Sequence, residues 1–186
     1  GDREITNLPP HEVFRTGSVR TFQTSQPLLK LTVLENLLVA EVDYGESIFR
    51  SFKRDWLAKE EMLVKKAFST LNFLGIEHLW NEQAMNLSGG QLRLLEIGRA
   101  LMCQTKLIIM DEPIAGVAPH LSHTVLKKLR DLSARGISFL IVEHRLDIIL
   151  EYVDQIYVMA GGKIIAEGRS KEVLDNPEVV EAYLGA

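Results

Sequence analysis

Two acidic residues follow an apolar run near the middle of the sequence. The run KLIIM (106–110) is followed by Asp111 and Glu112, and Pro113 then stops the strand that the run predicts. A carboxylate at the carboxyl end of a parallel strand lies where open α/β sheets bind ligands. Asp111 can hold Mg²⁺ through its oxygens, and Glu112 can orient and deprotonate an attacking water. An acidic turn at a strand end is the alternative reading.

A helix pattern that begins with two adjacent glycines precedes this strand. It reads NLSGGQLRLLEIGRALM (86–102), with Ser88, Gly89, Gly90 and Gln91 at its mouth. A helix N-terminus exposes unpaired N–H groups and carries partial positive charge. Glycines let a polyanion approach the backbone closely, and the Ser88 hydroxyl adds a donor, so the mouth is a candidate phosphate cradle. An N-cap with a flexible turn is the alternative, and it explains Ser88 but not the glycines.

Two more polar residues follow strand-like runs. His144 comes after FLIVE (139–143), where an imidazole can contact a phosphate or a nucleophilic water. Gln23 comes after VRTF (19–22), where a neutral amide can reach a metal or its water. Taken alone, each residue is better explained by the alternative, a surface histidine that caps a helix for His144 and a solvated loop glutamine for Gln23.

The elements that position these residues follow a clear pattern. Residues 31–85 read as helices, with a capping box at Thr32 and Glu35 and a second helix at 57–74 that stops at Gly75. Residues 86–186 alternate strands with helices, which predicts a parallel sheet whose strands are apolar on both faces. The expected strands are 106–110, 138–142 and 155–160, the expected helices are 119–134 and 145–152, and a hairpin turn is expected at Gly161-Gly162.

Composition excludes several classes of protein. The 186 residues carry a net charge of −4, so no basic field indicates nucleic acid or anionic lipid as a partner. No apolar run approaches the length of a membrane span. Cys103 is the single cysteine, so no disulfide forms within the chain, and its apolar surroundings favour a buried structural thiol over a nucleophile.

Together, the four motifs resemble those of the ATP-binding subunit of ABC transporters. In that family LSGGQ (87–91) is the signature motif and LIIMDEP (107–113) the Walker B strand, while Gln23 matches the Q-loop glutamine and His144 the switch histidine. The resemblance implies an α/β fold, the ABC-type nucleotide-binding domain, which is P-loop NTPase-like with a parallel sheet core and a helical subdomain. It divides this chain into a remnant of the N-terminal core at 1–23, a helical subdomain at 24–85 and an α/β core at 86–186.

The same resemblance implies an ATPase coupled to transport, with ATP and Mg²⁺ as cofactors. Glu112 and His144 would be catalytic, and Asp111 and Gln23 would face Mg²⁺. The signature residues Ser88 to Gln91 would act on ATP held by a second ATPase subunit, in a head-to-tail dimer. Transmembrane permease subunits are the other expected partners, nucleic acid is not expected, and the expected location is cytoplasmic, peripheral on the inner face of the cell membrane.

The segments TNLPPHEVFRTGSVRTFQ, DEPIAGVAP, VEHRLDII and NPEVVEAYLG are similar to importers of branched-chain amino acids. Two departures stand beside this likeness. No G-x-x-x-x-G-K-[ST] pattern occurs, so the Walker A part is expected to precede Gly1 and these residues alone are expected not to hydrolyse ATP. Ala118 stands where this type of subunit usually has Asn or Asp, which puts the polar contacts of that loop across the dimer in doubt.

Two other functions remain open from the sequence. The first is a degenerate, non-catalytic subunit that donates only its signature motif to a partner. Glu112 and His144 argue against it, because such a subunit has no need of them. The second is a non-transport ABC-type ATPase. The ordinary helices between Gln23 and Ser88, which lack coiled-coil heptads, argue against a DNA-repair ATPase of this kind.

Overall fold

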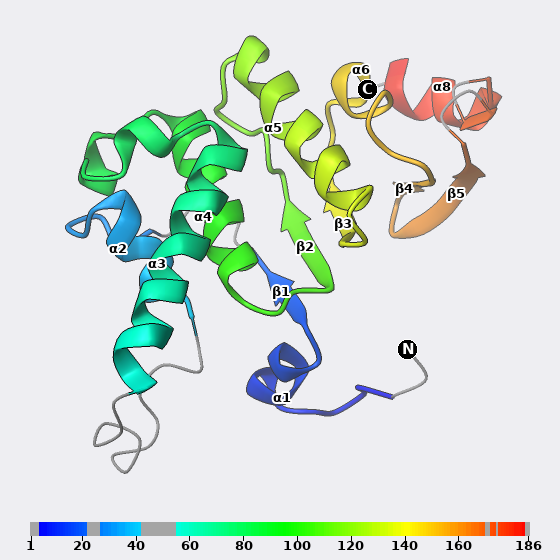
Figure 1. Cartoon of the computed structure of the whole chain (residues 1–186). Coiled ribbons are helices and arrows are strands. Elements are labelled where there is room, and N and C mark those ends of the chain that lie inside the picture. Colours follow the sequence, from blue (N-terminus) through cyan, green and yellow to red (C-terminus); the bar gives the residue numbers. More distant parts are fainter. Residues whose placement is uncertain (1–3, 22–26, 42–54, 170–171, 174, 185–186) are drawn as a thin grey trace. The chain divides into compact units, whose positions relative to one another are not determined.

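The computed structural model describes residues 4–21, 27–41, 55–169, 172–173 and 175–184 (Figure 1). The chain divides into two compact units, Gly1–Val142 and Glu143–Ala186. The first unit contains the parallel sheet, the helices that precede and connect its strands along the chain, and the motifs around Ser88 and Glu112. The second contains His144. Gln23 lies outside the described residues.

Three parallel strands form the sheet of the first unit. They are β1 (Ser18–Arg20), β2 (Leu107–Asp111) and β3 (Ser138–Val142), in the order β1-β2-β3. The register pairs Arg20 with Ile109 and Asp111 with Val142. The central strand therefore ends beside β3, so the carboxyl ends of the two strands lie together at one edge of the sheet. The predicted strands 106–110 and 138–142 are confirmed to within a residue.

The two faces of this sheet differ in burial. Ile108 and Met110 of β2 are fully buried on one face, whereas Leu140 and Val142 of β3 are 53% and 57% exposed on the other. Asp111 lies on the second face, because its register partner is Val142 and paired residues of parallel strands point the same way. β3 is apolar on both faces, with Phe139 and Ile141 on one and Leu140 and Val142 on the other, and α5 packs against this strand.

The helices α2 (Val33–Leu38), α3 (Asp55–Leu74) and α4 (Gly89–Met102) pack against one another. Their shared core consists of fully buried side chains, among them Leu37, Leu71, Leu74, Leu95, Ile97 and Met102. Two short 3₁₀ turns, η2 (Glu77–Leu79) and η3 (Ala84–Asn86), link α3 to α4. α3 packs closely against the C-terminal half of α4, the helix that begins with the predicted signature motif, since a Cβ at Gly98 would lie 3.0 Å from Leu74 Cδ1.

The predicted ends of these helices are confirmed. The Glu35 amide donates to Thr32 Oγ1 at 3.2 Å, and the Thr32 amide donates to Glu35 Oε2 at 2.7 Å, which is the expected capping box at the start of α2. Helix α3 ends before Gly75, which has φ of +78° as a glycine after a helix C-terminus commonly does. Local sequence signals thus decide where the helices begin and end.

The remaining helices of the first unit are α1 (Pro10–Arg15) and α5 (Pro119–Ser133). Helix α5 contacts both α4 and β3 (Figure 1). Its N-cap is Ala118, whose side chain makes no capping hydrogen bond, and Pro119 occupies the first helical position. The chain from β2 to α5 therefore passes directly by the signature helix.

The second unit contains α6 (Leu146–Ile149), β4 (Ile156–Ala160), β5 (Lys163–Gly168) and α8 (Pro177–Leu184). β4 and β5 form an antiparallel pair whose turn has positive φ at both Gly161 and Gly162, so the predicted hairpin is confirmed. Its small core joins Val158, Val173 and Val179. The helix expected at 145–152 is shorter in the structure, where α6 ends at Ile149. The Tyr152 amide donates to the Ile149 carbonyl, three residues back, which is the hydrogen bond of a 3₁₀ turn and ends the α-helix.

Within the part of the chain that the structure describes, none of the helices combines the length and apolar character that crossing a bilayer requires.

Candidate functional site

The mouth of α4 carries the first group of predicted site residues. Ser88 is the N-cap, and its Oγ accepts a hydrogen bond from the Gln91 amide at 3.4 Å. Gln91 Oε1 in turn accepts one from the Ser88 amide at 2.8 Å, which completes a capping box. Ser88 and Gly89 are exposed. The predicted cradle therefore lies at an ordered helix start that a ligand can reach.

The two glycines of the mouth have different surroundings. Gly90 is buried, and a Cβ at this position would lie 2.9 Å from Leu121 Cδ1 and 3.1 Å from Leu121 Cβ. Gly89 is exposed, and its Cβ would lie 3.3 Å from the Gly116 carbonyl oxygen. Close packing of α4 on the start of α5 thus gives Gly90 a structural role that the sequence does not reveal. Gly89 is the glycine that lies open to an approaching ligand.

The turn after β2 holds the second group. Asp111 is the last residue of the strand, and Glu112 follows it with φ of +47°, a left-handed conformation that costs a residue other than glycine about 1–2 kcal/mol. The Glu112 amide donates to the Val142 carbonyl at 2.9 Å, and the Glu112 carbonyl accepts from the Ala115 amide at 3.1 Å. Both carboxylate residues are half-buried. Backbone strain of this kind concentrates at functional sites.

A buried arginine joins the two groups, and the sequence reasoning missed it. Arg93 of α4 is 4% exposed, and its Nη1 lies 2.9 Å from Glu96 Oε2 in an ion pair. Its Nη2 donates to the Glu112 carbonyl oxygen at 3.4 Å. An Arg and a Glu three residues apart within an apolar helix pattern were the available signal. The structure therefore brings the signature helix and the Glu112 turn into direct contact.

His144 stands at the start of the second unit. Its side chain is 66% exposed, and its Nδ1 lies 4.0 Å from Glu143 Oε2. The Glu143 side chain is 2% exposed, and its carboxylate accepts hydrogen bonds from the amides of His144 at 3.2 Å and Arg145 at 3.4 Å. The buried Glu143 side chain thus holds the backbone from which His144 projects. Glu143 was not among the predicted site residues.

Metal-binding chemistry in this region rests on few ligands. Among the residues that the structure describes, no three His, Cys, Asp or Glu side chains gather into a metal-binding group. Mg²⁺ in phosphoryl-transfer sites is commonly held by one or two carboxylates together with substrate phosphates. A half-buried Asp111 at the strand end is suited to that mode and not to an all-protein cage.

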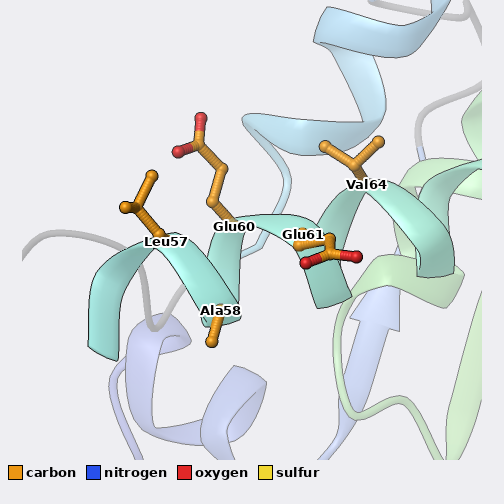
Figure 2. Close-up of a pocket in the computed structure, with 5 residues that line it drawn as sticks. All are labelled: Leu57, Ala58, Glu60, Glu61 and Val64. Atoms are coloured by element: carbon orange, nitrogen blue, oxygen red, sulfur yellow. The ribbon is translucent and has the colours of Figure 1, made fainter. Parts of the chain in front are cut away.

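The surface of α3 bears a hollow lined by none of the predicted site residues among those that the structure describes. Figure 2 shows its described lining, which consists of Leu57, Ala58, Glu60, Glu61 and Val64. These residues come from one helix, and Leu57 among them is exposed. The sequence assigns Leu57 to the apolar face of this helix. Its exposure shows that the N-terminal part of α3 is not packed as fully as the C-terminal part.

Comparison with known proteins places these motifs in a family. The model of the ABC transporter family matches residues 2–115, and a model described as branched-chain amino acid ATP-binding cassette transporter matches residues 163–186. The chain belongs to the ABC transporter family. The resemblance inferred from the motifs is thus confirmed, and so is the α/β fold class.

Individual ABC proteins are similar over almost the whole chain. A probable branched-chain amino acid transport ATP-binding protein of Archaeoglobus fulgidus is 61% identical over 184 residues, which are 99% of this chain and 72% of that protein. A protein of the same description from Methanocaldococcus jannaschii is 55% identical over 189 residues, 99% of this chain and 74% of the relative. The chain thus spans about three quarters of the length of these ABC relatives.

Solved structures of ABC cassettes share the fold. The crystal structure of a nucleotide-free ATP-binding cassette from an ABC transporter superposes with a TM-score of 0.81 at 54% identity, over 99% of this chain and 75% of the other. The ADP conformation of an ABC cassette gives a TM-score of 0.82 at 55% identity, over 99% and 74% of the two chains. As an ABC family member, the chain belongs with nucleotide-binding ATPases that are coupled to transport and serve as subunits of transporter complexes.

Proposed function

We propose that this chain is the ATP-hydrolysing subunit of an importer of branched-chain amino acids. The observation that carries the proposal is the hydrogen bond from Arg93, on the helix that begins with the capped mouth at Ser88, to the strained turn at Glu112. The relatives of this chain are described as branched-chain amino acid transport ATP-binding proteins. The match of residues 163–186 to the branched-chain amino acid cassette model supports the choice of solute.

Glu112 is the general base of the proposed reaction. Its carboxylate accepts a proton from the attacking water while the water oxygen bonds to the γ-phosphorus of ATP. The bond between the γ-phosphorus and the bridging oxygen breaks, and that oxygen leaves with its electron pair on ADP. Inorganic phosphate is the other product. The left-handed backbone and the bond of the Glu112 amide to Val142 support this role, because they determine the direction in which the side chain leaves the strand end.

Asp111 and Gln23 are proposed to face Mg²⁺. When bound with ATP, Mg²⁺ neutralises negative charge on the phosphate oxygens and lowers the cost of charge shifting toward the leaving group. The fit rests on the chemistry of Asp111, which supplies one hard carboxylate ligand at the edge where the strands end. His144 is proposed to contact the γ-phosphate or the attacking water, and its exposed side chain supports that role.

Ser88, Gly89, Gly90 and Gln91 are proposed to bind the γ-phosphate of ATP on a second ATPase subunit, in a head-to-tail dimer. The exposure of Ser88 and Gly89 and the partial positive charge of the helix start support a contact made from outside the chain. Transmembrane permease subunits complete the assembly at the cytoplasmic face of the membrane. The proposed division is an N-terminal core segment at 1–23, a helical subdomain at 24–85 and an α/β core at 86–186.

The test of the catalytic role uses residues 1–186 preceded by the N-terminal segment of the Archaeoglobus fulgidus relative, hereafter the fused chain. Glu112→Gln keeps the size of the side chain and removes its basicity. It should slow ATP hydrolysis by about 10²–10⁴, the usual contribution of a positioned base, and leave ATP binding by calorimetry nearly unchanged. Hydrolysis at the parent rate in this variant would remove Glu112 from the mechanism.

A second experiment tests the signature motif in trans. The chain of 186 residues is mixed with an intact homologous subunit that carries a hydrolysis-blocking Glu→Gln change. A mixed dimer should form with ATP and dissociate with ADP, because ADP lacks the anion that the Gly89 and Gly90 amides would bind. Ser88→Arg in this chain should abolish the mixed dimer without changing the partner's own affinity for ATP. A mixed dimer that survives Ser88→Arg would contradict the role in trans.

A further inference from the structure

The backbone of Glu112 needs an external restraint. Its φ of +47° is unfavourable for a residue with a side chain, and strained backbone persists only where surrounding contacts determine it. Two backbone hydrogen bonds act on Glu112, from its amide to Val142 at 2.9 Å and from the Ala115 amide to its carbonyl at 3.1 Å. The second closes a tight turn on the Glu112 carbonyl oxygen. Arg93 Nη2 donates to that oxygen.

The guanidinium of Arg93 is itself held in place. The side chains of Arg93 and Glu96 are 5% and 12% exposed, and Nη1 lies 2.9 Å from Glu96 Oε2. A planar guanidinium presents its N–H groups in a rigid fork, so pairing Nη1 with Glu96 also sets where Nη2 points. The burial of both side chains strengthens these bonds, because water does not compete for them. α4 thus carries a preorganised guanidinium whose Nη2 reaches the Glu112 turn.

We propose that Arg93, oriented by Glu96, is a positioning residue that couples the signature helix to the Glu112 turn of the same chain. It acts on the backbone of Glu112 and not on nucleotide. This inference rests on the proposed role of Glu112, and it adds a physical link between the helix mouth and the general base. A displacement of α4 as its mouth engages a partner's phosphate would then be transmitted to Glu112 through one side chain.

The first arm of the test measures the turn directly, without nucleotide or turnover. Removing Arg93 alone would take its ion-pair partner from the largely buried Glu96 carboxylate and destabilise the chain, so the variant is Arg93→Met with Glu96→Gln. Amide hydrogen exchange followed by NMR should be about 10-fold faster at Glu112 and Ala115 and unchanged in the fully buried part of β2. Arg135→Met is the matched control, since Arg135 lies over the Phe73 ring, 4.3 Å from its centroid, at the other end of α5.

The second arm measures steady-state ATP hydrolysis in the fused chain. The double variant should lower kcat about 10-fold at unchanged KM for ATP, because misplacing a base costs rate and not binding. Combined with Glu112→Gln it should cause no further loss, because Arg93 acts through Glu112. If Arg93 had only a structural role, the rate losses of the double variant and of Glu112→Gln would multiply, and amide exchange would be faster throughout the first unit.

The outcomes separate this inference from the proposed function. Parent exchange rates at Glu112 and Ala115 in the double variant would overturn the positioning role, and so would a loss of rate that multiplies with that of Glu112→Gln. If Glu112→Gln hydrolyses ATP at the parent rate, the proposed catalytic role fails while the exchange arm still decides whether Arg93 restrains the turn.

Discussion

Replacing Gly90 by alanine tests whether helix packing, besides any ligand, demands a glycine at the mouth of α4. The added Cβ would lie 2.9 Å from Leu121 Cδ1, 3.1 Å from Leu121 Cβ and 3.4 Å from Val117 Cγ1. The tip of Leu121 can rotate away, but its Cβ is attached to the backbone of α5. The start of α5 must therefore move relative to α4 to accept the methyl group.

The magnitude follows from two opposing effects. Alanine gains up to about 1 kcal/mol over glycine in a helix, whereas forcing one methyl group into a packed interface costs about 1–3 kcal/mol. We therefore expect Gly90→Ala to destabilise the first unit by about 1 kcal/mol. Gly89→Ala is the control in the same helical turn. Its Cβ would lie 3.3 Å from the carbonyl oxygen of the exposed Gly116, a loop that can shift, so its net effect should be close to zero.

Urea unfolding followed by tryptophan fluorescence measures this difference. Both tryptophans of the sequence, Trp56 and Trp80, belong to the first unit, so the signal reports that unit. With a slope of about 2 kcal/mol per molar urea, a loss of about 1 kcal/mol lowers the midpoint by about 0.5 M. A midpoint for Gly90→Ala at or above that of Gly89→Ala would refute the packing argument and leave ligand binding as the reason for both glycines.

Three further predictions concern single side chains. Ala118→Asn should raise the urea midpoint by an amount equivalent to about 1 kcal/mol of stability, because Ala118 is an extended N-cap whose side chain cannot accept a capping hydrogen bond. Ala134→Asn, at the C-terminal end of α5, is the control and should not raise the midpoint. The backbone N–H of Thr32 and then its hydroxyl hold the pKa of Glu35 below its ordinary value. The capping box therefore stabilises fully above that ordinary value and is lost as pH falls through the lower folded one. Carboxyl NMR titration should show this lowered pKa, and Thr32→Val, which removes the hydroxyl but keeps the backbone N–H, should reduce the shift without abolishing it. Burial of the thiol, and then the negative charge of Glu41, raises the pKa of Cys103, whose Sγ donates to the Ala40 carbonyl at 3.2 Å. Iodoacetamide at pH 8 should therefore alkylate Cys103 more slowly than it alkylates the thiol of glutathione. Unfolding in urea should remove this difference in rate.

Features that depend on short stretches of chain are predictable from the sequence. The capping boxes at Thr32 and Ser88 need only a residue and its neighbour three positions on, and both are present. The hairpin at Gly161-Gly162 likewise depends on two adjacent glycines. The family could be identified for a related reason, since its motifs are contiguous and their order along the chain is itself diagnostic.

Features that depend on distant residues could not be predicted in the same way. The packing reason for Gly90 lies 31 positions away at Leu121, and the partner of Arg93 at Glu112 is a backbone carbonyl, which any residue type would supply. The positive φ of Glu112 has no local signal, because glutamate rarely adopts it. The described site residues stand at strand and helix ends, and the turn at Glu112 is held there by tertiary contacts.

The close fit between α4 and the segment from Glu112 to Leu121 has a consequence for how these proteins diverge. Gly90 meets Leu121 and Val117, and Arg93 meets Glu112, so a change on one side alters what is acceptable on the other. Substitutions in the two segments are therefore epistatic, and each is viable only against a compatible partner segment. A signature motif grafted alone from a distant relative should carry a fitness penalty that grafting both segments together relieves. We therefore expect substitutions in residues 88–93 and in residues 112–121 to be tolerated together and not separately.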